Sequence, residues 1–102
     1  MKQLTTIREF EALRKPCIVW FSATWCGPCK RMHKPLIEET AAAAGVPLYY
    51  CENEEISDLN MIKMFPTFIA FNGDTQERYS SADTVRACQF IKRASAKLAP
   101  HS

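Results

Sequence analysis

The stretch Trp25-Cys26-Gly27-Pro28-Cys29-Lys30 constrains this chain more than any other. It follows a run of apolar, β-type residues and opens a segment with a helical pattern. Residues three apart on a helix are neighbours, and a disulfide needs Cα atoms only about 4.4–6.8 Å apart. The free N–H groups and positive dipole of a helix start favour thiolate over thiol. We therefore predict a redox pair, with Cys26 as the attacking sulfur and Cys29 as the resolving sulfur.

Composition limits the other possibilities. The 102 residues suffice for one domain with its own core, so we expect a single domain over residues 1–102. The net charge is only +2, with no block of like charges, which argues against binding to nucleic acid or to a membrane surface. The N-terminal residues lack the apolar region of a signal peptide, and no segment approaches the ~18 apolar residues of a membrane span.

The cysteine count indicates a reducing compartment. Five cysteines are an odd number, and only one pair is close in sequence, whereas a secreted disulfide scaffold shows an even and denser set. We therefore expect a cytoplasmic protein. Cys17, Cys51 and Cys88 lie in apolar patterns and are interpreted as small buried hydrophobic residues.

Hydrophobic periodicity predicts alternating strands and helices. We expect strands at 2–4, 17–21, 46–51, 67–71 and 76–80, and helices from 7 to 14 or 15, 26 to 44, 56 to 62 and 84 to 98. The continuous apolar run at 17–21 is typical of a central strand covered on both faces. This order predicts an α/β domain, a central mixed β-sheet flanked by helices on both faces. The connections through helices are expected to be parallel.

Local signals define the ends of these elements. Thr6 and Glu9 have the spacing of a capping box, Gly45 ends the long helix, and Asn72-Gly73 is a hairpin turn. Pro35 falls inside the long helix and predicts a kink there. Inward-facing positions are expected in the two longest helices, with Asp83 as the N-cap of the last one: Met32, Leu36, Val85, Cys88, Ile91 and Leu98.

The chain resembles thioredoxin. The resemblance rests on Trp25-Cys26-Gly27-Pro28-Cys29 after an apolar strand, on Phe65-Pro66-Thr67 before a second strand, and on the hairpin and C-terminal helix. It covers roughly residues 4–98 and implies the thioredoxin fold. The Gly-Pro dipeptide resembles that of the reducing members. The resemblance thus implies a thiol-disulfide oxidoreductase that reduces protein disulfides, with no cofactor besides its own cysteine pair and no metal.

Further site residues follow from the resemblance. Gly27, Pro28, Lys30 and Trp20 would tune the redox pair, although a solvated helix lysine is an equal reading of Lys30. Pro66 would be cis, whereas its residue pattern alone fits a proline at a strand start. An extended substrate segment would contact a surface that comprises Trp25, Phe65, Pro66, Thr67 and Ser81, the last standing where the family usually has glycine.

Trp20 is the main departure from the family pattern. Thioredoxins usually carry a buried aspartate at this position, which accepts a proton from the resolving cysteine, and a lysine on the next strand. Here the next strand offers Tyr49 and Tyr50, and an indole cannot accept that proton. We hypothesise that the Cys29 proton passes through water or through His33, four residues after Cys29 on the expected helix. The alternative is that His33 is an ordinary surface histidine.

The expected partners are a thioredoxin-reductase-type flavoenzyme and disulfide-containing clients such as peroxiredoxins or ribonucleotide reductase, with the protein itself a monomer. Two alternatives stay open. The first is a metal site, which one CxxC supplies with only two ligands. The second is a non-catalytic thioredoxin-fold module that binds partners without turnover.

Overall fold

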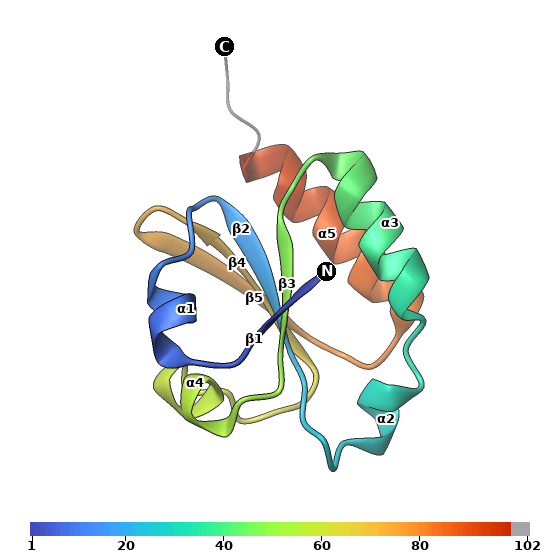
Figure 1. Ribbon diagram of the computed structural model, residues 1–102. Coiled ribbons are helices and arrows are strands. Elements are labelled where there is room, and N and C mark those ends of the chain that lie inside the picture. The colour runs from blue at the N-terminus through green and yellow to red at the C-terminus, as the bar shows by residue number, and fades with distance from the viewer. Residues whose placement is uncertain (99–102) are drawn as a thin grey trace.

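The computed structural model describes residues 1–98 and places a five-stranded sheet between helices on both faces (Figure 1), as predicted. The strands follow the spatial order β1-β3-β2-β4-β5. They are β1 (Lys2–Leu4), β2 (Cys17–Phe21), β3 (Leu48–Cys51), β4 (Thr67–Asn72) and β5 (Thr75–Ser80). The helices are α1 (Ile7–Glu11), α2 (Gly27–Lys30), α3 (Lys34–Ala44), α4 (Glu54–Leu59) and α5 (Thr84–Leu98).

The central strand β2 is buried along its whole length, which confirms the interpretation of its continuous apolar run. Alternate side chains of a strand point to opposite faces. Ile18 and Trp20 join the core under α3 and α5, whereas Cys17, Val19 and Phe21 join the core under α1 and α4. The two helical layers of Figure 1 therefore cover two separate apolar clusters.

Strand direction differs from the prediction at one connection. β1 and β2 run parallel to β3, but β4 runs antiparallel to β2, so the connection through α4 is not a parallel crossover. Because β4 runs back beside β2, the end of β2 and the start of β4 meet at the same end of the sheet, with Phe21 opposite Thr67. This reversal brings the segment after β2 and the segment before β4 together.

The first helix begins as expected and ends early. Thr6 is its N-cap and forms the predicted capping box with Glu9. Backbone and side-chain donors of Thr5, with further help from Thr6 and Lys2, lower the pKa of Glu9 to about 2. The helix ends at Glu11 rather than at residue 14 or 15. Pro16 follows shortly after this end, and a residue before a proline favours extended backbone. The Lys15–Pro16 bond is cis, which nothing in the sequence indicated.

The other turns follow their sequence signals closely. Gly45 ends α3 in the left-handed conformation, with φ of 72°, and the Val46 N–H donates to the Ala41 carbonyl over 3.1 Å. That bond closes a Schellman-type end and delays β3 to Leu48 instead of residue 46. The predicted hairpin is also present, with Gly73 at φ of 59°, but its turn is shifted by one residue to Gly73-Asp74, because Asn72 still pairs with Thr75.

The inward faces of the long helices are partly as predicted. Cys88, Ile91 and Leu98 are buried in α5, but Val85 is 61% exposed and Leu36 is 42% exposed. Asp83 caps α5 as predicted, because its Oδ1 accepts the Arg86 N–H over 3.0 Å. Val85 lies in the first turn of α5.

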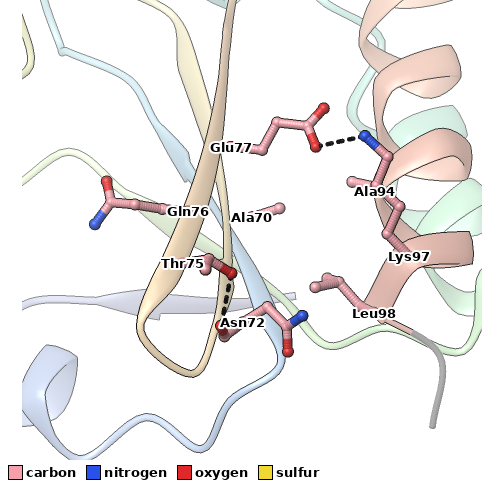
Figure 2. Close-up of a pocket in the computed structure, with 8 residues that line it drawn as sticks. All are labelled: Ala70, Asn72, Thr75, Gln76, Glu77, Ala94, Lys97 and Leu98. Carbon is pink, nitrogen blue, oxygen red and sulfur yellow. Dashed lines mark hydrogen bonds and ion pairs between the residues drawn. The ribbon is translucent and has the colours of Figure 1, made fainter. Parts of the chain in front are cut away.

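A hollow lies between β5 and the end of α5, lined by side chains such as Glu77 and Lys97 (Figure 2). The Lys97 Nζ lies 3.1 Å from Glu77 Oε1, and an exposed pair of this kind contributes about 0–1 kcal/mol. The hollow includes Asn72 and Thr75 of the hairpin turn, at the sheet edge opposite the cysteine pair. It therefore belongs to the periphery of the fold and not to the redox site.

Candidate redox site

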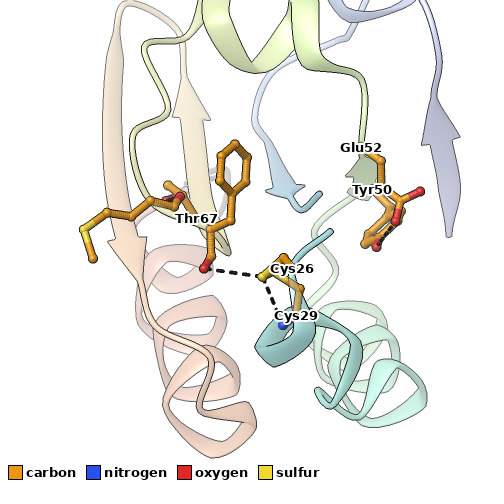
Figure 3. The surroundings of a disulfide bond; sticks show 7 residues. Cys26, Cys29, Tyr50, Glu52 and Thr67 are labelled. Carbon is orange, nitrogen blue, oxygen red and sulfur yellow. Dashed lines mark hydrogen bonds between the residues drawn. A yellow bond between two sulfur atoms is a disulfide. The ribbon is translucent and has the colours of Figure 1, made fainter. Parts of the chain in front are cut away.

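The predicted redox pair is joined as a disulfide between Cys26 and Cys29, with Cα atoms 5.3 Å apart (Figure 3). Cys26 is the N-cap of α2, and its Sγ accepts the Cys29 N–H over 3.2 Å. Pro28 lies in the first turn, where its missing N–H costs nothing. Both cysteines are buried, at 4% and 2% exposed. A donor placed like the Cys29 N–H favours a thiolate at Cys26 when the pair is reduced.

The expected continuous helix over 26–44 is wrong. The chain forms two helices, α2 and α3, with a break at residues 31–33, so Pro35 stands in the first turn of α3 instead of kinking a long helix. A proline is favoured at that position because the first N–H groups of a helix have no partner. The four residues of α2 carry only a small dipole. The direct N–H contact is therefore the main support for a Cys26 thiolate.

This break removes the geometric reason for a proton relay through His33. His33 is exposed and is the N-cap of α3, not a residue one turn after Cys29 on the same helix. The Nδ1 atom of its imidazole accepts the Leu36 N–H over 3.1 Å. The backbone N–H of His33 donates to Thr84 Oγ1. His33 thus has a capping role between α3 and α5, and the same-face argument was wrong.

The segment before β4 lies beside the disulfide. The Phe65–Pro66 bond is cis, as the family resemblance implied, and Pro66 is buried. Cys26 Sγ lies 3.6 Å from the Phe65 carbonyl oxygen. In the dithiol form this carbonyl can accept the Cys26 S–H. The cis-proline segment therefore forms a second wall of the site.

A hydroxyl pair that the sequence did not reveal connects this wall to β5. Thr67 Oγ1 donates to the Met64 carbonyl over 2.7 Å and lies 2.7 Å from Ser80 Oγ. A hydroxyl has one proton, so Ser80 donates to Thr67. Ser81 follows directly and is half-buried, and its Oγ accepts the Asp83 N–H. The loop after β5 thus lies next to the cis-proline segment.

One side of the site is apolar and open. Trp25 is 74% exposed, and its ring meets Phe65 edge to face with centroids 5.3 Å apart. Met64, directly before Phe65, is 63% exposed. Lys30 is exposed in the last turn of α2, while Gly27 is half-buried. The Trp25, Phe65 and Met64 side chains offer a partner chain an apolar surface beside Cys26.

Trp20 is fully buried and surrounded by rings. It stacks on Phe68 at 5.2 Å and meets Tyr50 edge to face at 5.1 Å, and Tyr50 is its register partner on β3, as the sequence suggested. The Tyr50 hydroxyl donates to Glu52 over 2.9 Å, and burial raises the pKa of Tyr50. Trp20 Nε1 is buried with no partner among residues 1–98. Thus Trp20 is a packing residue that accepts no proton.

The three remaining cysteines are free and buried. Burial raises the pKa of Cys17 to about 11 and also raises that of Cys51. Thiols of this kind are poor nucleophiles. The structure agrees with their interpretation as small core residues and leaves Cys26 as the candidate reactive sulfur.

Sequence reasoning missed a cavity beside Trp25 and Phe65, lined partly by α4. Its acidic residues are visible in the stretch Glu52-Asn53-Glu54-Glu55 and at Asp58. No sequence pattern, however, indicates which of these side chains face the redox pair. Only the position of α4 against the segment after β2 determines that.

Comparison with known proteins assigns the same architecture. The family model described as thioredoxin matches residues 4–93. A putative thioredoxin-5 from Dictyostelium discoideum is 32% identical, over 83% of this chain and 90% of its own length. The X-ray structure of Fasciola hepatica thioredoxin is 28% identical with a TM-score of 0.78, covering 92% of this chain and 99% of that one.

A third similarity is to another solved structure. It is a chain from structural work on thiol resolution in a yeast mitochondrial 1-Cys peroxiredoxin by the glutathione and thioredoxin systems. That chain is 25% identical, with a TM-score of 0.73, and the match covers 91% of this chain and 94% of that one.

Proposed function

Because this chain belongs to the thioredoxin family, we propose that it reduces protein disulfides, with Cys26 as the attacking thiolate and Cys29 as the resolving thiol. The protein is a thiol-disulfide oxidoreductase, and its chemistry is dithiol-disulfide exchange. The observation that supports the two roles is the Cys26–Cys29 disulfide at the start of α2, with the Cys29 N–H directed at Cys26 Sγ.

The proposed reaction has two exchange steps. The Cys26 thiolate attacks one sulfur of a client disulfide, which forms a mixed disulfide and releases the other client sulfur as a thiolate. Cys29 then loses its proton to water and attacks Cys26, which releases the second client thiolate. The client gains two electrons, and the protein is left with the Cys26–Cys29 disulfide. Trp20 stands where the family has an acid, so no side-chain base is assigned to this step.

The other site residues position the client in this proposal. Trp25, Phe65, Pro66, Thr67 and Ser81 would contact an extended client segment that lies between the cis-proline wall and the loop after β5. Their support is the proximity of Phe65 to Cys26 Sγ and the hydroxyl pair between Thr67 and Ser80. Gly27, Pro28 and Lys30 would tune the redox potential through the backbone and charge of α2.

A thioredoxin-reductase-type flavoenzyme would return two electrons to the disulfide. Peroxiredoxins and ribonucleotide reductase are the client classes proposed, and the peroxiredoxin study noted above supports the first. We place the protein in the cytoplasm as a monomer, in keeping with three free buried cysteines. None of the helices within residues 1–98 has the length and apolar character to cross a membrane.

The test is reduction of a model protein disulfide by the pre-reduced protein. We expect the rate of disulfide reduction by Cys26→Ser to fall to that of buffer alone. Cys29→Ser should form a mixed disulfide with the client, which mass spectrometry detects. Cys88→Ser, which changes a buried free cysteine, is the control and should keep the wild-type rate. A Cys26→Ser protein that reduces the client at the wild-type rate would refute the assignment.

A further inference from the structure

A cavity of about 150 Å³ opens beside the reactive sulfur. Two of its walls are the rings of Trp25, which precedes Cys26, and Phe65, whose carbonyl oxygen lies 3.6 Å from Cys26 Sγ. An apolar cavity of about 150 Å³ binds benzene, so this space accommodates one planar side-chain group. Trp25, the residue before Cys26, and Phe65 place this space next to the redox pair.

The polar groups around this cavity are mainly acceptors. Glu52, Glu54 and Asp58 contribute three carboxylates, and none of the described residues that line the cavity is basic. Glu52 is half-buried and accepts the Tyr50 hydroxyl, whereas Glu54 and Asp58 are exposed at the rim. The electrostatic character of the cavity therefore favours a cation.

Ser57 is a second, independent feature of this cavity. It lines the cavity, is only 2% exposed, and its hydroxyl has no partner in the part of the chain that the structure describes. Its backbone groups are already occupied, because its N–H donates to the Asn53 carbonyl and its own carbonyl accepts the Ile62 N–H. A buried hydroxyl without a partner is costly, and a donor entering the cavity would supply its partner.

We propose that this cavity binds an arginine side chain of the client, close in the client's sequence to the disulfide that Cys26 attacks. This inference rests on the proposed function and adds to it the kind of client that is preferred. Binding here involves no bond changes. It holds the client so that its sulfur approaches Cys26.

Arginine fits the cavity better than lysine does. A guanidinium is planar and stacks on aromatic rings, and the exposed Trp25 and its neighbour Phe65 offer ring surfaces. Its five N–H donors can reach carboxylates and a hydroxyl at once, which matches Glu54, Asp58 and Ser57. A lysine ammonium is a compact charge with no planar face.

The experiment compares disulfide peptides that differ at one residue beside the attacked cysteine: arginine, citrulline or lysine. Citrulline has nearly the shape of arginine but no charge. The pre-reduced protein is mixed with each peptide, and the second-order rate constant of reduction is measured. We expect arginine to exceed citrulline by roughly tenfold, the ratio for one charge-assisted contact, with lysine in between. Added salt should lower the arginine preference.

The variants use charge removal at the rim. Glu54→Gln combined with Asp58→Asn should bring the arginine-to-citrulline ratio close to one, while the citrulline rate stays at its wild-type value. Glu55→Gln is the matched control, because Glu55 is exposed on the same helix but does not line the cavity. It should leave the ratio unchanged.

Each other outcome overturns the proposal. If the wild-type protein reduces the arginine and citrulline peptides at equal rates, the cavity does not select a cation. Equal rates for the arginine and lysine peptides would remove the assignment to arginine. If the ratio survives in the double variant, the preference arises elsewhere. If no peptide is reduced at all, the proposed function fails, and this inference fails with it.

Discussion

The core under α3 and α5 differs from the rim beside Cys26, which we define by the cavity residues Glu54 and Asp58, in where polar groups are placed. In the core, Trp20 packs between Tyr50 and Phe68, and even its indole N–H has no partner among residues 1–98. At the rim, Glu54 and Asp58 lie exposed around a cavity that borders Trp25. The Glu54 and Asp58 carboxylates thus lie where solvent reaches them, and the Trp20 ring lies where it does not.

The difference separates two uses of an acidic group. An ionised carboxylate in an apolar core is costly unless it is paired, and its usual value in such a place is to exchange a proton. At an exposed rim the same group costs little and attracts a cation. This chain therefore has acids suited to recognising a partner, and an apolar ring at the position where the family resemblance implied a buried acid.

The largest expected effect comes from Trp20→Asp, which would place an acid in the core. Removing the indole leaves a cavity worth about 3–5 kcal/mol, and an ionised carboxylate adds to that loss. Burial raises the pKa of the new aspartate above its unfolded value of about 3.9. Its extra cost is therefore absent below that pH and grows by about 1.4 kcal/mol per pH unit up to the folded pKa.

Urea unfolding at several pH values measures this dependence. Trp20→Asn is the control, since it leaves a similar cavity but does not titrate. A constant difference between the two variants across pH would contradict a low-dielectric core. In the same variant, the titrations of the Cys26 and Cys29 thiols should become more strongly coupled, and an unchanged thiol titration would count against a link between this position and the redox pair.

The next largest effect is the difference in reactivity between the Cys26 thiol at the redox site and the Cys17 thiol in the core. In the reduced native protein, an alkylating reagent should modify Cys26 at least about a hundredfold faster than Cys17, because only the thiolate reacts. Burial raises the pKa of Cys17 from 9.0 to about 11, so its thiolate fraction at neutral pH is about a hundredfold lower than that of an unperturbed thiol.

Peptide mapping after timed alkylation measures both rates. The Cys17 rate should rise with pH up to about 11 and no further. All five cysteines should react alike in denaturant, which serves as the control for reagent access. Modification of Cys17 at a rate similar to Cys26 in the folded protein would mean that the core opens on the time scale of the experiment.

The contrast between core and rim also explains what could be predicted from sequence. The α/β class, the central strand at 17–21 and the cysteine pair follow from periodicity and spacing, since these signals are local and each element has its own. The cis state of Pro66 came from the family resemblance, because its residue pattern alone left the trans form open. The capping role of His33 was missed because the helix break at residues 31–33 had been interpreted as a kink at Pro35.

The acidic cavity was beyond sequence reasoning for a different reason. Glu54, Glu55 and Asp58 look equivalent on a short helix, yet only Glu54 and Asp58 line the cavity. That distinction depends on how α4 lies against the segment after β2, a tertiary relation with no local signature. The antiparallel return of β4 was missed on the same grounds.

A smaller effect is expected for Trp20→Phe. Phenylalanine keeps a ring against Phe68 and removes the indole N–H that lacks a partner. The lost volume costs stability, but the removed polar group offsets part of that cost, so we expect a net loss of no more than about 1.5 kcal/mol. Trp20→Leu, which also lacks the N–H but cannot stack, should lose more. A loss for Trp20→Phe as large as that for Trp20→Ala would mean that the N–H has a buried water partner.

The smallest expected effect is on the stability of the rim variants, and it decides whether the rim acids are structural. Glu54→Gln with Asp58→Asn should change the free energy of unfolding by no more than about 0.5 kcal/mol. Glu54 loses a favourable place in the first turn of α4, but the repulsion among the three cavity carboxylates falls at the same time. Glu55→Gln removes a charge from the same first turn but not from the cavity. Comparing its urea unfolding with that of the double variant therefore isolates the repulsion among the cavity carboxylates. A loss above about 2 kcal/mol would show that these acids hold α4 in place, and the division between an apolar core and a recognition rim would then no longer hold.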